Sequence, residues 1–301
     1  MSGMARIRGL AFLCSSALAA LALAGCTAGS AALELDDLAQ VADASASADT
    51  ASFELTLEQE LGSQSFSVSA GGAFDTAHDR ARLALDLSSI AEVFSSFGTA
   101  FGAKPEDLEK FGAPAKWKVE AIQDGTRFYV SSPLFESALP AGKTWISGDI
   151  EKIGRQHGVD IGQVGAFGKS DPRDMLDLLR AVSGDLEQVG DDEIRGVSAT
   201  HYRTTLDADE LGAQLANTEA KGLADGFADT IRSAGLEEVP IDVWVDEDSL
   251  LRRLEMTIEL EQLGSKAESS FSMDLFDYGE PVDVTPPPAA QVADVAELQK
   301  R

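Results

Sequence analysis

Cysteine and histidine are scarce in this chain of 301 residues, which has two cysteines and three histidines. Two cysteines exclude a disulfide-rich scaffold. His78, His157 and His201 lie far apart in the sequence and leave little from which to build a histidine metal site. The sequence also has no phosphate-binding loop, zinc-protease helix, Gly-x-Ser-x-Gly elbow or Ser-x-x-Lys pair. We therefore expect a protein that is not an enzyme, with no catalytic residues, no cofactor and no metal.

Positive charge is also in short supply. Lysine and arginine number 24 against 51 aspartates and glutamates, which gives a formal net charge of −27. Such a chain repels the phosphates of nucleic acids and the surfaces of anionic membranes. This argues against a nucleic-acid-binding function, and any membrane attachment must come from something other than a basic patch. The apolar content of 44% is that of an ordinary globular protein.

Near the N-terminus, the apolar stretch of residues 10–24 is too short to span a bilayer, which takes about 20 apolar residues. With Arg6 and Arg8 before it, the stretch is typical of a secretory signal. It ends in Leu-Ala-Gly-Cys at residues 23–26, which matches the bacterial lipobox. The sequence therefore predicts that Cys26 is acylated and becomes the first residue of the mature chain.

Lipidation of Cys26 would hold the protein at a membrane, because two or more acyl chains give stable anchoring. We expect residues 1–25 to be a lipoprotein signal peptide and the mature protein to be extracytoplasmic, anchored to the outer face of the cell membrane. The alternative is an ordinary signal peptide with a cysteine at its cleavage site by chance, which would leave a lone exposed thiol.

Segments with a two-residue alternation of apolar and polar side chains recur through the mature chain. Phe53, Leu55 and Leu57, for example, alternate with Glu54 and Thr56. This alternation is the mark of an antiparallel sheet with one apolar and one wet face. The segments are 53–61, 66–70, 83–87, 117–121, 128–130, 197–206, 241–245, 254–260 and 271–275, with hairpin turns expected at 61–63, 124–125, 246–248 and 264–265.

Helical segments interrupt these strands, and a sheet with an apolar face must bury that face against something. We expect helices at 33–48, 90–101, 105–111, from 172 onward, at 207–215 and at 218–234. The predicted fold is α+β: a strongly curved antiparallel sheet whose apolar concave face is covered by helices. Its expected parts are a lipidated tether and helix at 26–48, the domain at 49–280 and a Pro-rich tail at 281–301.

Apolar side chains at helical spacing are the candidates for a ligand-lining surface. They could line the mouth of a lipophilic cavity, or they could be plain core, and in a curved sheet these two roles overlap because the cavity wall is the inner face of the core. These candidates are Phe94, Phe97, Phe101, Leu176, Leu179, Phe227 and Ile231.

Three polar features have ordinary structural interpretations. Asp207 begins a segment that starts like a calcium loop but has leucine and threonine at two ligand positions, so a helix N-cap is the better interpretation. The acidic runs 191–193 and 246–248 are typical of solvated turns. His201 has no partner cysteine or serine that would make it catalytic, and we expect it to be structural.

The whole pattern resembles a known family. A lipobox cysteine is followed by an Ala-rich helix and by strands as far as the hairpin Val-Trp-Val-Asp-Glu-Asp-Ser-Leu-Leu-Arg-Arg-Leu at 243–254. The closing strand is Phe-Asp-Tyr-Gly-Glu-Pro-Val-Asp-Val-Thr-Pro-Pro at 276–287. These two segments are the most specific. The chain resembles the LolA-like lipoproteins, in particular the actinobacterial LppX/LprG type, over about residues 33–288.

The resemblance implies a half-barrel closed by helices over a hydrophobic cavity, and carriage of a lipid or lipophilic ligand across the extracytoplasmic space. It implies no catalytic residues. A second hypothesis is a regulatory or interaction lipoprotein of the same fold, with a filled core and a protein partner in the envelope. The two differ in whether the folded protein has an open apolar cavity.

Overall fold

The computed structural model describes residues 35–61, 64–89, 117–149, 152, 179, 186–215, 221–262 and 265–298. The chain divides into two units, Met1–Ala32 and Leu33–Arg301, and the second of these contains all the described residues. Phe94, Phe97, Phe101 and Leu176 of the predicted set, and Cys26, lie outside the described residues.

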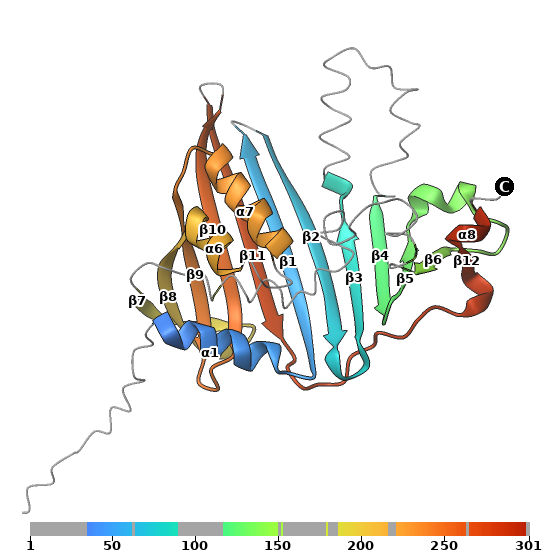
Figure 1. Cartoon of the computed structure of the whole chain (residues 1–301), viewed down its shortest axis with the longest axis horizontal. Coiled ribbons are helices and arrows are strands. Elements are labelled where there is room, and N and C mark those ends of the chain that lie inside the picture. The colour runs from blue at the N-terminus through green and yellow to red at the C-terminus, as the bar shows by residue number, and fades with distance from the viewer. Residues whose placement is uncertain are drawn as a thin grey trace, which may run out of the picture. The chain divides into compact units, whose positions relative to one another are not determined.

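The described strands form one twelve-stranded sheet, which curves strongly and stays open (Figure 1). Its order is β12-β6-β5-β4-β3-β2-β1-β11-β10-β9-β8-β7. The strands are β1 (Thr50–Leu61), β2 (Gln64–Asp75), β3 (Arg80–Asp86), β4 (Lys118–Asp124), β5 (Arg127–Ser131), β6 (Trp145–Asp149), β7 (Glu187–Ile194), β8 (Val197–Asp207), β9 (Glu238–Asp246), β10 (Leu251–Gln262), β11 (Ser265–Phe276) and β12 (Val292–Asp294).

The long-range pairing of β1 with β11 joins the two halves of this sheet. Ten antiparallel pairs connect the strands, from Ser52 opposite Phe276 to Leu61 opposite Ala267. All other described pairings join strands that follow one another along the chain, except the parallel pair of β12 with β6. One half of the sheet is therefore the meander β1–β6, and the other is the meander β7–β11.

The curved antiparallel sheet confirms the predicted fold class, and the alternating segments are strands as expected. The predicted hairpin joins are also present, since β1–β2, β4–β5, β9–β10 and β10–β11 are antiparallel neighbours. Strands β6, β7 and β12 lack a clear alternation and were not among the predicted strands. β12 lies within 281–301, for which the sequence suggested a tail, and it pairs with Trp145–Ser147 at the edge of the sheet.

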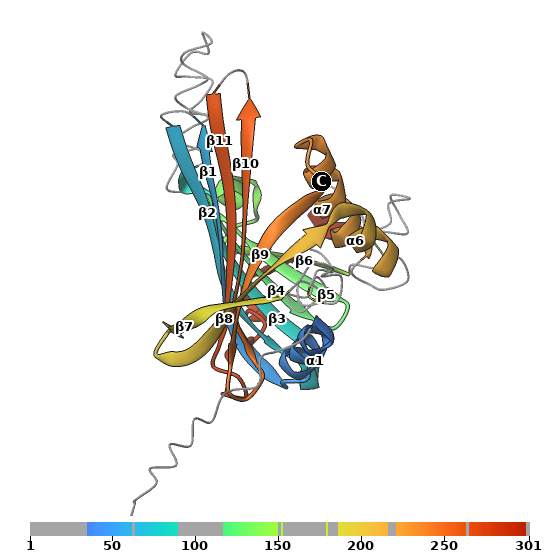
Figure 2. The same cartoon turned by 90° about the vertical axis from the view of Figure 1, so that its left-hand side faces the viewer.

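Three helices lie on the concave face of the sheet (Figure 2). They are α1 (Leu35–Ala46), α6 (Ala208–Gln214) and α7 (Lys221–Ser233). Asp207 caps α6, because its carboxylate accepts the backbone N–H groups of Asp209 and Glu210 at 2.7 and 2.9 Å. This confirms the N-cap interpretation. The short helices η1 (Thr76–His78), η4 (Pro133–Ala138), η6 (Ala289–Gln291) and α8 (Val295–Leu298) lie in connections or near the C-terminus.

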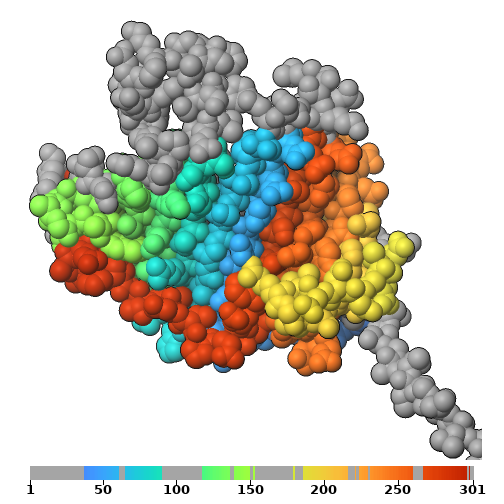
Figure 3. Space-filling model, turned by 180° about the vertical axis from the view of Figure 1, so that it is seen from behind, coloured from blue at the N-terminus to red at the C-terminus, as the bar shows by residue number. Residues whose placement is uncertain are grey.

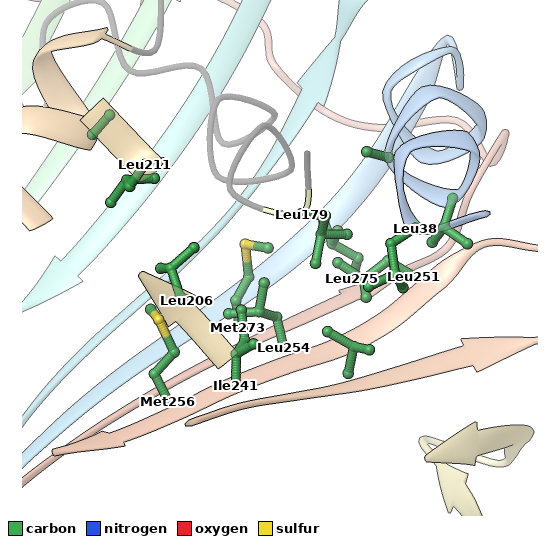
Figure 4. Packing of buried hydrophobic residues seen from close by; sticks show 14 of the residues in the cluster. Leu38, Leu179, Leu206, Leu211, Ile241, Leu251, Leu254, Met256, Met273 and Leu275 are labelled. Carbon is green, nitrogen blue, oxygen red and sulfur yellow. The ribbon is translucent and has the colours of Figure 1, made fainter. Parts of the chain in front are cut away.

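The main hydrophobic core lies between these three helices and strands β8–β11, β1 and β2. Leu38 and Val41 of α1, Leu211 of α6 and Ile231 of α7 belong to one buried cluster with the concave side chains of the strands. Figure 4 shows members of this cluster, with Leu254, Met273 and Ile241 gathered on the sheet. The helices bury the apolar face that the alternating strands present.

A glycine at residue 72 is required by close packing. A Cβ atom there would lie 2.0 Å from the carbonyl oxygen of Arg82 and 2.6 Å from Cζ of Phe53. The first contact is with backbone of the neighbouring strand, which cannot move aside without breaking the β2–β3 pairing. At the adjacent Gly71, on the opposite face, the nearest atom would be 3.8 Å away. Gly72 therefore cannot be replaced without a clash, whereas Gly71 has room for a side chain.

We expect Gly72→Ala to lower the free energy of unfolding by about 3 kcal/mol, a cost typical of overpacking at a rigid site. Gly71→Ala is the matched control and should change stability by less than about 1 kcal/mol, because its methyl group meets only ordinary contacts. Urea unfolding followed by circular dichroism measures both. Equal stabilities of the two variants would contradict the close approach at residue 72.

Candidate ligand-binding face

The concave face divides into a filled part and a partly exposed part. Over β8–β11 most of the apolar side chains are buried beneath α1, α6 and α7, and Leu254, Met273 and Ile241 have no exposed surface. Over β2–β5, six aliphatic side chains of the same face are only half-buried. Those side chains are Val68, Leu83, Leu85, Val119, Ala121 and Val130.

This partly exposed surface consists of aliphatic side chains from four adjacent strands. The strand register places Leu85 of β3 between Ala70 of β2 and Val119 of β4, and Leu83 between Gly72 and Ala121. Directly opposite residues share a face, so these side chains form two neighbouring rows across the sheet. We define the six half-buried residues, together with Ala70 and Gly72, as the β2–β5 apolar surface. It offers hydrocarbon contacts and no charge.

The predicted ligand-lining residues that the structure describes belong to the filled part. Leu179 and Ile231 are buried in the main core, with 2% and 1% of their surface exposed. Phe227 of α7 packs against this core, with its ring edge-on to that of Phe271 at a centroid distance of 6.5 Å. Whether these residues or the four outside the described ranges contact a ligand stays a prediction. Sequence reasoning missed the β2–β5 apolar surface, although the alternation at residues 83–87 had placed its leucines on one face.

The convex face is polar and is partly covered by the β7–β8 hairpin (Figure 3). Under this hairpin Trp244 is buried and stacks on His201, with ring centroids 4.2 Å apart. The indole N–H of Trp244 donates to Asp192 at 2.9 Å, and Nε2 of His201 lies 2.6 Å from Asp242. His201 is thus part of a structural stack, as the sequence suggested.

Each acidic run agrees only in part with the solvated turn that the sequence suggested: residues 191–193 are exposed but do not form a turn, and the run 246–248 lies at a turn but includes a buried residue. Residues 191–193 belong to strand β7, and Asp192 accepts the indole N–H of Trp244. Asp246 does lie at the β9–β10 turn, but it is buried. Its carboxylate accepts Nε of Arg252 at 2.6 Å and the backbone N–H groups of Asp248 and Leu250 at 2.9 Å. A run of acidic residues predicts exposure to solvent. It does not reveal that Arg252 and two backbone N–H groups bind the Asp246 carboxylate in the folded protein.

Asp274 of β11 is the centre of an ion-pair network on the convex face. Arg253 of β10 binds it at 2.6 and 2.9 Å, and Arg195 at the β7–β8 turn donates to it at 3.0 Å. Arg195 also pairs with Glu54 and lies 4.0 Å above the ring of Phe276. Burial alone would raise the pKa of Asp274, but the hydrogen bonds from the two arginines outweigh it and hold the pKa below its usual value.

An open groove of about 440 Å³ lies beside this network, on the convex face. Gly71 and Ala84 form its floor, and Phe276 lies on one side. The charged side chains around it pair with neighbours: Glu54 with Arg195, Lys118 with Asp86 and Glu120 with Arg82. The charged groups around the groove are therefore paired with one another, in contrast to the uncharged β2–β5 apolar surface.

Neither a metal site nor a membrane-crossing helix is found in the described part of the chain. Among those residues no three histidine, cysteine or acidic side chains gather in a way that could hold a metal ion. In the same residues, no helix has the length and apolar character needed to cross a bilayer.

No protein-family model matches the chain. An uncharacterized 31.2 kDa protein of Streptomyces griseus is 29% identical over 205 residues, which cover 66% of this chain and 63% of the relative, less than two thirds of its length.

Two solved structures are similar to this chain at low sequence identity. LprF of Mycobacterium bovis is 15% identical, with a TM-score of 0.45, and the match covers 85% of this chain and 97% of LprF. The lipoprotein LppX of Mycobacterium tuberculosis is 14% identical, with a TM-score of 0.43, and the match covers 83% and 97%.

The Asp274 network should make stability depend on pH in the acid range. A carboxyl group whose pKa is lowered by folding stabilises the folded state above its unfolded pKa of about 3.9, and this stabilisation is lost as the pH falls through the folded value. We expect Asp274→Asn to cost about 2 kcal/mol at neutral pH and to flatten the loss of stability below about pH 4. Urea unfolding across a pH series tests this, and parallel curves for variant and wild type would contradict it.

Proposed function

We propose that this protein is a non-enzymatic lipoprotein of the cell envelope, anchored through acylated Cys26, that binds a lipid or other lipophilic ligand and carries or presents it. The observation that carries the proposal is the β2–β5 apolar surface. Aliphatic side chains on the inside of a curved sheet remain half-buried there, while most of the same face is buried over β8–β11. A hydrocarbon ligand would complete their burial.

The energetics favour a ligand with an apolar chain. Removing apolar surface from water contributes about 25 cal/mol per Å², so a ligand that covers about 200 Å² gains about 5 kcal/mol before ordering costs. Leu83, Leu85 and Val119 supply this kind of surface and no charged or hydrogen-bonding group. Binding would therefore select for apolar character and shape.

The lipid anchor would keep the binding face near the membrane. Eight residues lie between Cys26 and Leu35, the first residue of α1. A chain of this length reaches at most about 30 Å when fully extended. Because α1 packs on the sheet, the domain would be tethered at α1 within that distance of the anchor, close to a membrane in which lipids are available.

A second candidate function is supported by the filled core beneath the three helices. Leu38, Leu211 and Ile231 are at most 1% exposed. This part of the concave face is therefore filled by side chains and has no space for a ligand. If the β2–β5 apolar surface also binds no lipid, an interaction or regulatory lipoprotein with a protein partner is the better explanation.

Native mass spectrometry of residues 27–301, with organic extraction, tests the proposal. This segment contains the compact unit Leu33–Arg301 and lacks Cys26, so an acyl chain of the protein's own anchor cannot be mistaken for ligand. We expect a co-purifying lipid in stoichiometric amount, or uptake of lipid from added vesicles of phosphatidylglycerol and phosphatidylethanolamine. A clean unliganded mass after both treatments would contradict the carrier function.

Two substitutions on strand β3 test whether the ligand binds to the β2–β5 apolar surface. Leu85→Gln places a polar amide on the concave side, and we expect it to weaken binding of a fluorescent fatty acid about tenfold, because a buried amide without a partner is costly. Ala84→Gln is the matched control, since Ala84 is exposed on the convex side of the same strand. It should bind as the wild type does. Equal losses in the two variants would place the ligand elsewhere.

A further inference from the structure

We propose that the ring of Phe53 is the end wall of the ligand site and sets the length of the acyl chain that it accepts. This inference rests on the proposed function and adds a residue that determines specificity. It follows from the position of Phe53 in one row of the sheet and from the contact of its ring with Gly72.

The first observation is where the burial changes. The pairing places Leu275, Phe53, Gly72, Leu83 and Ala121 in one row across β11, β1, β2, β3 and β4 on the concave face. Leu275 and Phe53 are both 2% exposed, whereas Leu83 and Ala121 are half-buried. Phe53 is therefore the last sealed residue of this row.

The second observation is the direction of the ring. A Cβ atom on Gly72 would lie 2.6 Å from Cζ, the far end of the Phe53 side chain. The ring thus leans over β2, toward the β2–β5 apolar surface, and fills the space that a side chain at residue 72 would take. Phe74, the next concave residue of β2, is also 2% exposed and continues the boundary.

The wall predicts a limit on chain length. An acyl chain that lies across β5, β4 and β3 toward β1 meets this ring after Leu83. Each methylene group buried before the wall should raise affinity about fourfold. Methylene groups beyond the wall would stay in water or displace a packed ring, so affinity should stop rising at one chain length.

The experiment is displacement of a fluorescent fatty acid from residues 27–301 by saturated fatty acids of about 8 to about 22 carbons. The wild type, Phe53→Ala and Phe53→Leu are compared. Leu254→Ala is the control, because it removes a fully buried side chain from the filled part of the core and lowers stability to a similar degree. Circular dichroism confirms folding, and Phe53→Leu decides the question if Phe53→Ala does not fold.

We expect affinity to level off in the wild type and in Leu254→Ala at the same chain length, and to level off at a chain a few carbons longer in the Phe53 variants. If affinity does not level off with chain length, or levels off at the same length in all four proteins, Phe53 is not the end wall. The carrier function would not be contradicted by either result. Failure of every fatty acid to bind the wild type, with no co-purifying lipid, would overturn the carrier function and with it the wall.

Discussion

The pairing of β1 with β11 is the constraint on which the rest of the structure depends. It joins residues separated by more than 200 positions, such as Phe53 and Leu275, and makes one sheet from two meanders. Without it the apolar face of β1–β6 and that of β8–β11 would be two separate surfaces. With it they become one concave face, part of which the helices fill and part of which they leave half-buried.

On the convex face, ion pairs also connect β1 with β11. Arg195, at the tip of the β7–β8 hairpin, reaches Glu54 on β1 and Asp274 on β11, and Arg253 on β10 binds the same aspartate. Strand β1, the β7–β8 turn and the β10–β11 hairpin, which are distant in the sequence, thus share one network. Charges on the wet side and leucines on the dry side therefore hold the same strands together, and the hairpin covers the stack of Trp244 on His201.

Local pattern predicted most of the fold, and the reasons for the misses are physical. The alternation at 53–61 and 254–260 is strong because each strand has one wet face, and these strands were predicted correctly. Strand β7 was missed, because the acidic run at 191–193 lies on an edge strand whose side chains are mostly exposed. β12 is a strand only through its pairing with Trp145–Ser147, which no local signal announces.

The sequence by itself determined which residues are apolar on one side of most strands, where α1 and α6 begin to within two residues, and that Cys26 has the context of a lipidation site. These are local properties with a period of two or of 3.6 residues, or short motifs. Only the tertiary structure decided that Phe53 lies over Gly72, that Asp246 is buried against Arg252, and that Leu85 faces a partly exposed surface while Leu254 does not. Those outcomes depend on strand register, on the curvature of the sheet and on where three helices pack, and each of these is set by contacts between residues far apart in the chain.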